Sequence, residues 1–460
     1  MYKVNFNKPI KLHFTGIGGI SMSALAEIMM DRGFTVTGSD MQHSDIADHL
    51  ESLGATVFYG QREENVADDV ELLIYTAAVH EDNPELIAAG KKNIPTITRA
   101  DFLGQIMTNY ATAIGVAGTH GKTTTTSMLS QVMMTADMDP TILVGGIMPA
   151  IQGNIRVGHS GHMITEACEY TNSFLSFRPT IGIILNVAAD HLDFFKDLDD
   201  IRHSFRKYAE LIPEDGILVI NSDIENLDYF TDDLKCKVVT VGSDPSKSDY
   251  AAVDITYDEF ALPSFKLVVR GNEVRDIKLK VNGEHNVFNS LAAIAAAAEM
   301  GVSVDTIADA LLLYEGTDRR FQFKGKLGDV TIVDDYAHHP DEIKAIIHTA
   351  KQVNHDRMVV CFQPHTYTRT QALLDEFAGA LSNADMVVLA DIYAAREKNT
   401  IGISSRDLKD KIEKLGTEVY YFPSFSEIEN FLLENLEKND LLITMGAGDV
   451  VKIGEHLLGN

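Results

Sequence analysis

The chain has 460 residues, of which 45% are hydrophobic and 23% charged, and its formal net charge is −28. This composition is typical of a soluble globular enzyme, and the length predicts about three domains. The negative charge argues against nucleic acid and anionic membranes as partners, because a polyanion would be repelled at long range. Anionic small substrates would therefore have to be bound by local features such as glycine loops, helix N-termini, single basic residues and metal ions.

The N-terminus and the cysteines bear on where the protein works. Residues 1–8 contain no long apolar segment of the kind found in signal peptides, and no run approaches the roughly 20 apolar residues of a membrane span. The three cysteines, Cys168, Cys236 and Cys361, are far apart and odd in number, which argues against a disulfide framework. These features predict a cytoplasmic protein without membrane insertion, and they leave its oligomeric state open.

The first predicted domain, residues 1–110, alternates apolar strands with helical segments. Strands are predicted at 11–15, 35–40, 56–59 and 72–75, and a helix from residue 22 ends at Gly33. This alternation predicts a parallel, doubly wound sheet.

A glycine loop follows the first strand of this domain. Its pattern, Gly16-x-Gly18-x-x-Ser21, nearly matches the dinucleotide fingerprint, with Ser21 in place of the third glycine. Asp40 stands at the end of the next strand, where a ribose-binding acid would lie. Taken alone, the loop is compatible with a NAD site, a nucleotide-diphosphate site or a plain tight turn.

The second predicted domain, residues 111–316, begins with the most informative segment of the chain. An apolar strand at 113–117 leads into Gly118-Thr119-His120-Gly121-Lys122-Thr123-Thr124, and a helix follows. The glycines allow backbone N–H groups to turn inward, the lysine can reach the terminal phosphates, and the hydroxyl of Thr123 can hold Mg²⁺. The loop departs from the general phosphate-loop pattern because Val116 stands at the first glycine position. The alternative is a tight strand-to-helix turn with a solvated lysine.

Two further side chains in this domain are candidate metal ligands. Glu169 follows the strand 163–165, and a carboxylate at a strand end beside a phosphate loop suits Mg²⁺. His191 follows the strand 181–185, between Asp190 and Asp193. The simpler interpretations are that Glu169 is a solvated loop charge and that His191 has a structural role.

The rest of the second domain has a different pattern. Residues 252–281 predict an antiparallel meander with a turn at 270–273, and an alanine-rich helix is predicted from Asn289 to residue 300. His285 and Asn286 are expected to cap that helix, although they could also hold an adenine or a phosphate.

The third predicted domain, residues 317–460, is again α/β. Its strands are predicted at 330–333, 358–362, 386–390, 418–421 and 441–444. Arg319 and Arg320, at the domain junction, are either surface charges or a cation for a phosphoryl group. His338 and Arg369 each follow a strand, where an open α/β sheet places its ligand crevice.

The chain resembles the Mur ligases over nearly its whole length, with motifs in the order of that family. The matching stretches are 13–19, 118–124, 189–193, 285–289, 319–321, 335–340, 363–365, 391–397 and 445–449. The phosphate loop and the Asp190–His191 pair are shared across the family. The first glycine loop, the His338-His339-Pro340 segment and Tyr393-Ala394-Ala395-Arg396-Glu397 point to the alanine-adding member.

The resemblance implies an α/β fold of three domains: an N-terminal Rossmann-like domain, a central P-loop ATPase domain with an antiparallel insertion, and a C-terminal Rossmann-like domain. It implies ATP and Mg²⁺ as cofactors, with UDP-N-acetylmuramate and L-alanine as substrates. The lactyl carboxylate would be activated as an acyl phosphate before the amine attacks. A murein peptide ligase, which joins a whole peptide to the same sugar nucleotide, is the alternative within the family. A NAD-dependent oxidoreductase is the alternative outside it, and it leaves the Gly-Lys-Thr loop unexplained.

The resemblance also distributes roles over the residues. The UDP part would be bound by Gly16, Gly18, Gly19, Ser21, Ser39 and Asp40. ATP would be held by residues Gly118 to Thr124 together with His285, Asn286, Asn289 and Arg319, and the metal ions by Thr123, Glu169 and His191. The catalytic set would be Lys122, Glu169, His191, Arg320, His338 and Arg369, of which His338 and Arg369 are the candidates for holding the amino acid.

The chain departs from the family pattern at several positions. Cys168 and Thr171 replace two acids that often flank the metal-binding glutamate, while Glu169 is kept. Thr366 stands where some members carry arginine, which leaves substrate contacts there open. Phe205 aligns with a lysine that related ligases carbamylate, so we predict no such modification.

Overall fold

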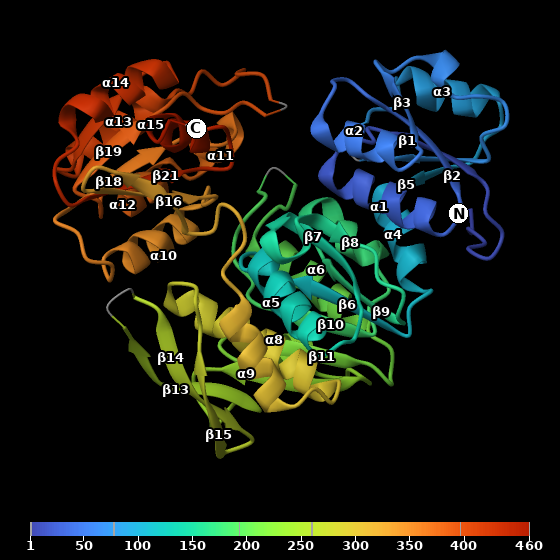
Figure 1. The fold of residues 1–460 in the computed structure, drawn as a ribbon, viewed down its shortest axis with the longest axis horizontal. Helices are drawn as coiled ribbons and strands as arrows, with labels where there is room; N and C mark the ends of the chain where they lie inside the picture. The colour runs from blue at the N-terminus through green and yellow to red at the C-terminus, as the bar shows by residue number, and fades with distance from the viewer. Residues whose placement is uncertain (1, 77–78, 193, 259–260, 396, 460) are drawn as a thin grey trace. The chain divides into compact units, whose positions relative to one another are not determined.

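The computed structural model describes residues 2–76, 79–192, 194–258, 261–395 and 397–459. Asp193 and Arg396, which belong to two predicted motifs, lie outside these residues. The chain divides into two compact units, which we describe separately: residues 1–187, 202–240 and 292–306 form the first, and residues 188–201, 241–291 and 307–460 form the second. The strands of these residues form three β-sheets, which confirm the α/β fold predicted from the sequence, and Figure 1 labels many of their strands.

The first sheet is fully parallel, with the order β3-β2-β1-β4-β5. Its strands are β1 (Lys11–Thr15), β2 (Thr35–Asp40), β3 (Thr56–Tyr59), β4 (Leu72–Tyr75) and β5 (Thr96–Thr98). The helices between them are α1 (Ile20–Asp31), α2 (Asp45–Ser52), the 3-10 turn η1 (Glu63–Asn65), α3 (Pro84–Lys91) and α4 (Arg99–Met107). The chain leaves β1 toward β2 on one side and later returns to β4 on the other. The glycine loop after β1 therefore lies at a topological switch point, where open α/β sheets bind ligands.

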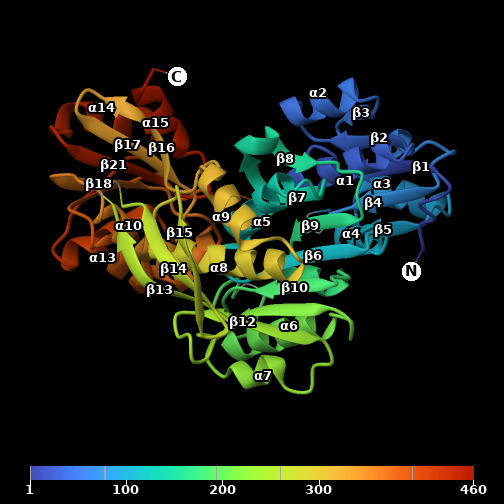
Figure 2. The same ribbon diagram turned by 60° about the horizontal axis from the view of Figure 1, so that its bottom comes forward.

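The second sheet has ten strands in the order β15-β14-β13-β12-β11-β10-β6-β9-β7-β8. The strands are β6 (Thr112–Ala117), β7 (Thr141–Met148), β8 (Gly153–Arg156), β9 (His162–Glu166), β10 (Ile181–Ile184), β11 (Ile217–Asn221), β12 (Lys237–Gly242), β13 (Tyr250–Tyr257), β14 (Pro263–Val269) and β15 (Asn272–Lys278). The helices are α5 (Lys122–Thr135), η2 (Pro149–Ile151), η3 (Tyr170–Ser176), α6 (Leu198–Glu210), α7 (Leu227–Thr231), α8 (Glu284–Glu299) and α9 (Val304–Leu313). The predicted antiparallel meander is confirmed, and β13, β14 and β15 form one ribbon in both views (Figures 1 and 2).

The phosphate-loop strand β6 lies inside this sheet, between β10 and β9. Burial on both faces explains why its sequence is a continuous apolar run rather than an alternating one. Helix α5 follows it and is buried over most of its length, including the consecutive threonines Thr123 to Thr126. These β-branched residues are weak helix formers, so tertiary packing holds this helix in place.

The third sheet has the order β16-β17-β21-β18-β19-β20 and is parallel except for β16. Its strands are β16 (Gln322–Leu327), β17 (Val330–Asp335), β18 (Arg357–Phe362), β19 (Met386–Leu389), β20 (Glu418–Tyr421) and β21 (Asp440–Met445). The helices are α10 (Pro340–Ala350), α11 (Tyr367–Ala372), α12 (Leu374–Leu381), α13 (Ser405–Lys414), α14 (Phe425–Asn435) and α15 (Val451–Leu457). Val360 and Phe362 of β18 belong to one apolar cluster, while Val359 and Cys361 belong to another. Both faces of this sheet are therefore covered, as in a doubly wound domain.

Two predicted boundaries need correction. The alanine-rich helix α8 begins at Glu284 rather than Asn289, so His285 and Asn286 lie in its first turn instead of ahead of it. Helix α1 begins at Ile20, which places Ser21 inside the helix. The β7–β8 hairpin was not predicted. Within the part of the chain that the structure describes, no helix combines the length and the apolar character needed to cross a membrane.

Candidate active site

The first glycine loop is fixed by backbone hydrogen bonds to the neighbouring strand. The N–H groups of Gly16 and Ile17 donate to the carbonyl of Ser39, over 2.8 and 2.9 Å. The N–H of Gly18 donates to the carboxylate of Asp40 over 2.9 Å. A pocket of about 550 Å³ opens beside this loop, within the size range of small-molecule sites.

The predicted residues of the first loop take different positions around this pocket. Gly16, Gly19 and Asp40 line it. Ser21 is exposed in the first turn of α1. Ser39 is fully buried, and its hydroxyl donates to Glu85 over 2.7 Å. The side chain of Ser39 therefore supports the loop from within the domain, rather than contacting a ligand as the sequence suggested.

The phosphate loop requires glycine at two positions. Gly118 and Gly121 have φ angles of +148° and +85°, in the region that residues with a side chain rarely adopt. A Cβ at Gly118 would also lie 2.9 Å from the Cβ of Leu185. Gly121 is the N-cap of α5, so the loop delivers Lys122 and Thr123 to the N-terminus of a helix, where anions are favoured.

A residue that the sequence analysis did not select, Asn186, clamps the phosphate loop. Its side-chain oxygen accepts from the N–H of His120 over 2.8 Å, and its amide donates back to the His120 carbonyl over 3.0 Å. Its own carbonyl accepts from the N–H of Thr119. The available signal was its place two residues after the end of strand β10, which pairs with β6.

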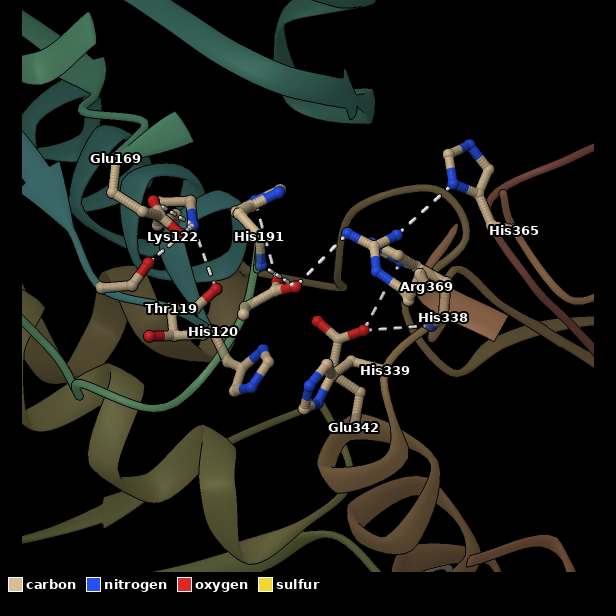
Figure 3. Close-up of polar contacts among 12 residues, drawn as sticks. Thr119, His120, Lys122, Glu169, His191, His338, His339, Glu342, His365 and Arg369 are labelled. Carbon is tan, nitrogen blue, oxygen red and sulfur yellow. Dashed lines mark hydrogen bonds and ion pairs between the residues drawn. The ribbon is translucent and has the colours of Figure 1, made fainter. Parts of the chain in front are cut away.

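The predicted catalytic residues Lys122 and Glu169 are brought together, as Figure 3 shows. The ammonium of Lys122 lies 3.0 and 3.2 Å from the two carboxylate oxygens of Glu169. It also donates to the carbonyls of Gly118 and Thr119, over 2.6 and 3.0 Å. Burial alone would lower the pKa of Lys122, but the carboxylate of Glu169 outweighs it, and the pKa is raised. The lysine is therefore charged and held by an internal partner.

The donor groups around this lysine fit a magnesium ion. Thr123 offers a hydroxyl and Glu169 a carboxylate, which are the hard oxygen ligands that Mg²⁺ prefers, and both residues are buried. Burial raises the pKa of the Cys168 thiol, so that neighbour remains protonated and does not supply a thiolate ligand. Glu166 is used differently, because its carboxylate accepts from the N–H of Gly145 over 2.5 Å.

In the second unit, Asp190 lies among cationic and imidazole groups. It accepts from the backbone N–H of His191 over 2.7 Å, and a guanidinium nitrogen of Arg369 lies 3.3 Å from the same carboxylate oxygen. Burial alone would raise the pKa of Asp190, but His191, Arg369 and His339 lower it to about 2. His191 has a φ angle of +52°, an uncommon conformation for a residue with a side chain and one often found at functional sites.

The C-terminal ends of the third sheet carry a group of rings beside Arg369. His338 and His365 have ring centroids 5.7 Å apart, and Arg369 lies 3.4 Å from Nδ1 of His365 (Figure 3). Burial lowers the pKa of His338, and its Nδ1 lies 3.0 Å from the carbonyl of Tyr336. A neutral His338 that donates from Nδ1 to this carbonyl keeps its lone pair on Nε2. The two residues proposed from the sequence to hold the amino acid thus share one cluster.

The paired arginines at the start of the third domain are oriented differently. Arg319 forms an ion pair with Asp334 at 2.9 Å and donates to the carbonyls of Gly446 and Gly448, over 2.6 and 3.0 Å. Its guanidinium therefore connects β17 with the segment that follows β21. Arg320 lies over the ring of Tyr336, 5.4 Å from its centroid.

The predicted nucleotide contacts on α8 are ordered by one another. Asn289 donates to the side-chain oxygen of Asn286 over 2.9 Å, and Asn286 donates to the carbonyl of Asn282 over 2.8 Å. Burial and the charge of Arg320 lower the pKa of His285 to about 4. A neutral imidazole results, which suits an uncharged ring such as a base better than a phosphate.

Models of known protein families match three consecutive segments. The Mur ligase family catalytic domain matches residues 11–111, the Mur ligase middle domain matches 116–297, and the Mur ligase glutamate ligase domain matches 319–448. These segments include the first glycine loop, the phosphate loop and the His338–Arg369 cluster, respectively.

Similar proteins cover the whole chain. UDP-N-acetylmuramate–L-alanine ligases of Lachnospira eligens and Agathobacter rectalis are each 56% identical over 458 residues, with 100% of both chains covered. A solved UDP-N-acetylmuramate-alanine ligase from Thermotoga maritima is 31% identical, with a TM-score of 0.82 and 98% of each chain covered. A murein peptide ligase from Psychrobacter arcticus has the same fold, at 24% identity and a TM-score of 0.73, with 98% of each chain covered. With three family models over most of its length and relatives above half identity, the chain belongs to the Mur ligase family.

Proposed function

We propose that this protein joins L-alanine to the lactyl carboxylate of UDP-N-acetylmuramate, with cleavage of ATP to ADP and phosphate, in the synthesis of peptidoglycan precursors. The observation that carries the proposal is the match at 56% identity, over the full length, to relatives named for this reaction. The charged Lys122–Glu169 pair at a helix N-terminus supports the ATP-dependent step. Two solved murein peptide ligases, which represent the alternative, are less similar, at 24% identity over 98% of the chain and 27% identity over 68% of it.

The chemistry requires an activated acid, because a carboxylate is a poor electrophile. In the first step a lactyl oxygen attacks the γ-phosphorus, its bond to phosphorus forms, and the bond to the ADP oxygen breaks. The protein positions the groups and neutralises their charge, as in other phosphoryl transfers. Lys122 would turn from Glu169 to the β- and γ-phosphates, while Gly118 to Thr124 surround them with backbone N–H groups.

Metal ions and the remaining nucleotide contacts complete this step. Thr123 and Glu169 would hold one Mg²⁺ and His191 a second, and the metal supplies positive charge for the phosphate oxygens. His285, Asn286 and Asn289 would contact the nucleoside of ATP. Arg320 would place positive charge near the transferred phosphoryl group. Arg319 would hold β17 and the segment after β21 in the arrangement that contacts ATP.

The second step is assigned to the His338–Arg369 cluster. Arg369 would bind the carboxylate of alanine by a charge-assisted pair. The amine must lose a proton before it attacks, and Nε2 of a neutral His338 is a suitable acceptor. The amine nitrogen then bonds to the acyl carbon, and collapse of the tetrahedral intermediate expels inorganic phosphate.

The sugar nucleotide is assigned to the pocket at the first glycine loop. The N-terminus of α1, which begins directly after the loop, favours its diphosphate. Asp40, at the pocket wall, would accept from a ribose hydroxyl. We place the reaction in the cytoplasm, because ATP and nucleotide sugars are its substrates and the cysteines are free thiols. The net charge of −28 supports the absence of nucleic acid partners.

Phosphate release from ATP and UDP-N-acetylmuramate tests this proposal directly. Each candidate amine is added in turn: L-alanine, L-serine, glycine and L-alanyl-γ-D-glutamyl-meso-diaminopimelate. We expect rapid release with L-alanine and only background release when either the sugar nucleotide or the amine is omitted. Release that depends on the tripeptide and not on alanine would favour the murein peptide ligase instead.

A further inference from the structure

A fully buried carboxylate lies beneath the first glycine loop. Glu85, the second residue of α3, has no exposed surface. Its oxygens accept from the hydroxyls of Thr15 and Ser39 and from the amide of Asn65, each over 2.7 Å. Nε2 of His13 lies 3.3 Å away. Four side chains from three segments of the first domain, β1, β2 and η1, thus converge on one acid.

These contacts explain how a carboxylate is tolerated there. An ion without partners inside a domain costs several kcal/mol, and a carboxyl group would otherwise take up a proton. Burial does raise the pKa of Glu85, but the bonds from His13, Asn65 and Thr15 outweigh it, and the pKa is lowered. Glu85 is therefore an ionised acceptor, to which several donors are firmly oriented.

Two of the donors are directly connected to the glycine loop. Thr15 ends β1 and is followed at once by Gly16. The backbone carbonyl of Ser39 accepts the N–H groups of Gly16 and Ile17, while its hydroxyl is held by Glu85. Both strands that set the path of the loop are thus tied to the same carboxylate.

The third donor extends the connection to the turn after β3. Asn65 donates to the carbonyl of Gly60 over 2.9 Å as well as to Glu85. The N–H of Gly60 in turn donates to the carbonyl of Asp40, and the carboxylate of Asp40 accepts from Gly18. Glu85 therefore joins the ends of β1 and β2 and the turn after β3 to the start of α3.

The same elements form the pocket wall. Gly16, Gly19 and Asp40 line it on the loop side, and Asn83 and Pro84, which directly precede Glu85, line it from α3. Glu85 itself does not belong to the lining. A change at Glu85 would therefore act on a ligand only through the backbone that surrounds it.

We propose that Glu85 is a positioning residue that holds the first glycine loop in the geometry that binds the diphosphate of the sugar nucleotide. The inference rests on the proposed function, because it takes this pocket as the site of UDP-N-acetylmuramate. A loop already fixed in its binding conformation gains affinity, because less ordering is needed when the ligand arrives. No motif in the sequence marks this acid, which stands at an ordinary helix start.

Glu85→Gln is the test variant, because it keeps the size of the side chain and removes its charge. An amide nitrogen must replace one of the two oxygens. At one position it would face the NH₂ group of Asn65, and at the other it would face Thr15, Ser39 and His13. At least one donor then loses its acceptor. Ser39→Ala is a milder second variant that removes one bond and keeps the carboxylate.

Leu73→Ala is the matched control for general destabilisation. Leu73 is fully buried in the same domain, belongs to an apolar cluster with Ala88 and Ala89 of α3 and pairs in register with His13, but its side chain makes no polar contact with Glu85. Loss of a buried leucine side chain should lower the melting temperature at least as much as loss of a hydrogen bond does. A purely structural role of Glu85 would make the two variants behave alike.

The experiment is calorimetric titration of the full-length protein with UDP, combined with steady-state kinetics. For Glu85→Gln we expect the Kd for UDP and the KM for UDP-N-acetylmuramate to rise about tenfold or more, with kcat and the KM for ATP changed less than about twofold. Ser39→Ala should weaken UDP binding by about threefold, and Leu73→Ala by less than about twofold. Equal UDP affinity in wild type, Glu85→Gln and Ser39→Ala would overturn the proposal, and so would an equal loss in Leu73→Ala. A wild-type protein that binds UDP but releases no phosphate with alanine would instead refute the proposed ligation.

Discussion

The strand–glycine loop–helix unit between β1 and α1 differs from the one between β6 and α5 in where its charged side chain lies. In the first, between β1 and α1, the charge is the carboxylate of Glu85, which is buried and receives four donors. In the second, between β6 and α5, the charge is the ammonium of Lys122, which is part of the loop and is held by Glu169. The first loop is thus supported by a buried charge beneath the ligand surface, in addition to Asp40 at the pocket wall, whereas the second carries its charge within the loop itself.

This difference separates binding from chemistry. A loop that is organised from below holds the N-terminus of α1 ready for a diphosphate and needs no rearrangement. A loop whose lysine already has an anionic partner must exchange that partner for phosphate, and Glu169 becomes available for a metal at the same moment. We therefore regard the first loop as a rigid binding element and the second as the one that changes during turnover.

The largest effect should come from Lys122→Ala. Removal of an oriented cation from the phosphoryl-transfer site should slow phosphate release by roughly 10²–10³-fold. UDP affinity should stay at the wild-type value, because the two loops are organised independently. Lys91→Ala, which removes an exposed lysine from the same chain, is the control. Near-normal turnover by the Lys122 variant would remove the distinction between the two loops.

The next largest effect should come from a change at Glu169, the internal partner of Lys122. Glu169→Gln should lower phosphate release by roughly 10²-fold, because a metal ligand and the partner of Lys122 are lost together. The variant should also need more magnesium for half-maximal activity, whereas UDP binding should not change. A magnesium titration of both proteins provides the measurement. An unchanged magnesium requirement would assign Glu169 to holding the lysine alone.

The contrast between these two loops also explains what the sequence could predict. The phosphate loop is local: its glycines, lysine and threonine are adjacent in the chain, so spacing alone indicated the site. The same holds for the buried strand before it and for the meander of β13 to β15, where strand and turn signals follow one another directly. Local patterns of this kind fixed the three-domain α/β fold correctly.

The supporting contacts could not be predicted, because they join distant segments. Glu85 accepts hydrogen bonds from Thr15, which is 70 positions away in the chain, and from Asn65, which is 20 positions away. No local pattern around Thr15 or Asn65 indicates that Glu85 is the partner. Asn186 contacts His120 from 66 positions away. The start of α8 was missed for a related reason, because the first turn of a helix is often stabilised by packing and not by its own residues.

A third prediction lies outside both loops. Arg369→Ala should raise the KM for alanine by roughly 10- to 100-fold, since a charge-assisted bond to a carboxylate contributes roughly 1.5–3 kcal/mol. The variant should keep most of the positional exchange of ¹⁸O within ATP that UDP-N-acetylmuramate induces, because acid activation precedes amine attack. Loss of this exchange would move Arg369 to the phosphoryl-transfer step, and the alanine pocket would have to lie elsewhere.

The smallest expected effect is a difference between the two loops in how their contributions to stability depend on pH. The pKa of Glu85 is lowered from 4.5 in the folded protein, so its stabilising contribution is present above about pH 4.5 and is lost as the pH falls through the folded pKa. The pKa of Lys122 is raised from 10.5, so its contribution is complete below that pH and is lost only in more alkaline solution. Acid should therefore act on the first loop and leave the lysine contribution intact.

Between pH 7 and pH 3.5, the melting temperature of wild type should fall more than that of Glu85→Gln, by on the order of 1–2 °C for a chain of this size. The comparison of melting curves cancels the titration of the other acids, because both proteins share them. A parallel fall in the two proteins would mean that the pKa of Glu85 is the same in the folded and unfolded states, and its proposed role as a stabilised charged acceptor would fail with it.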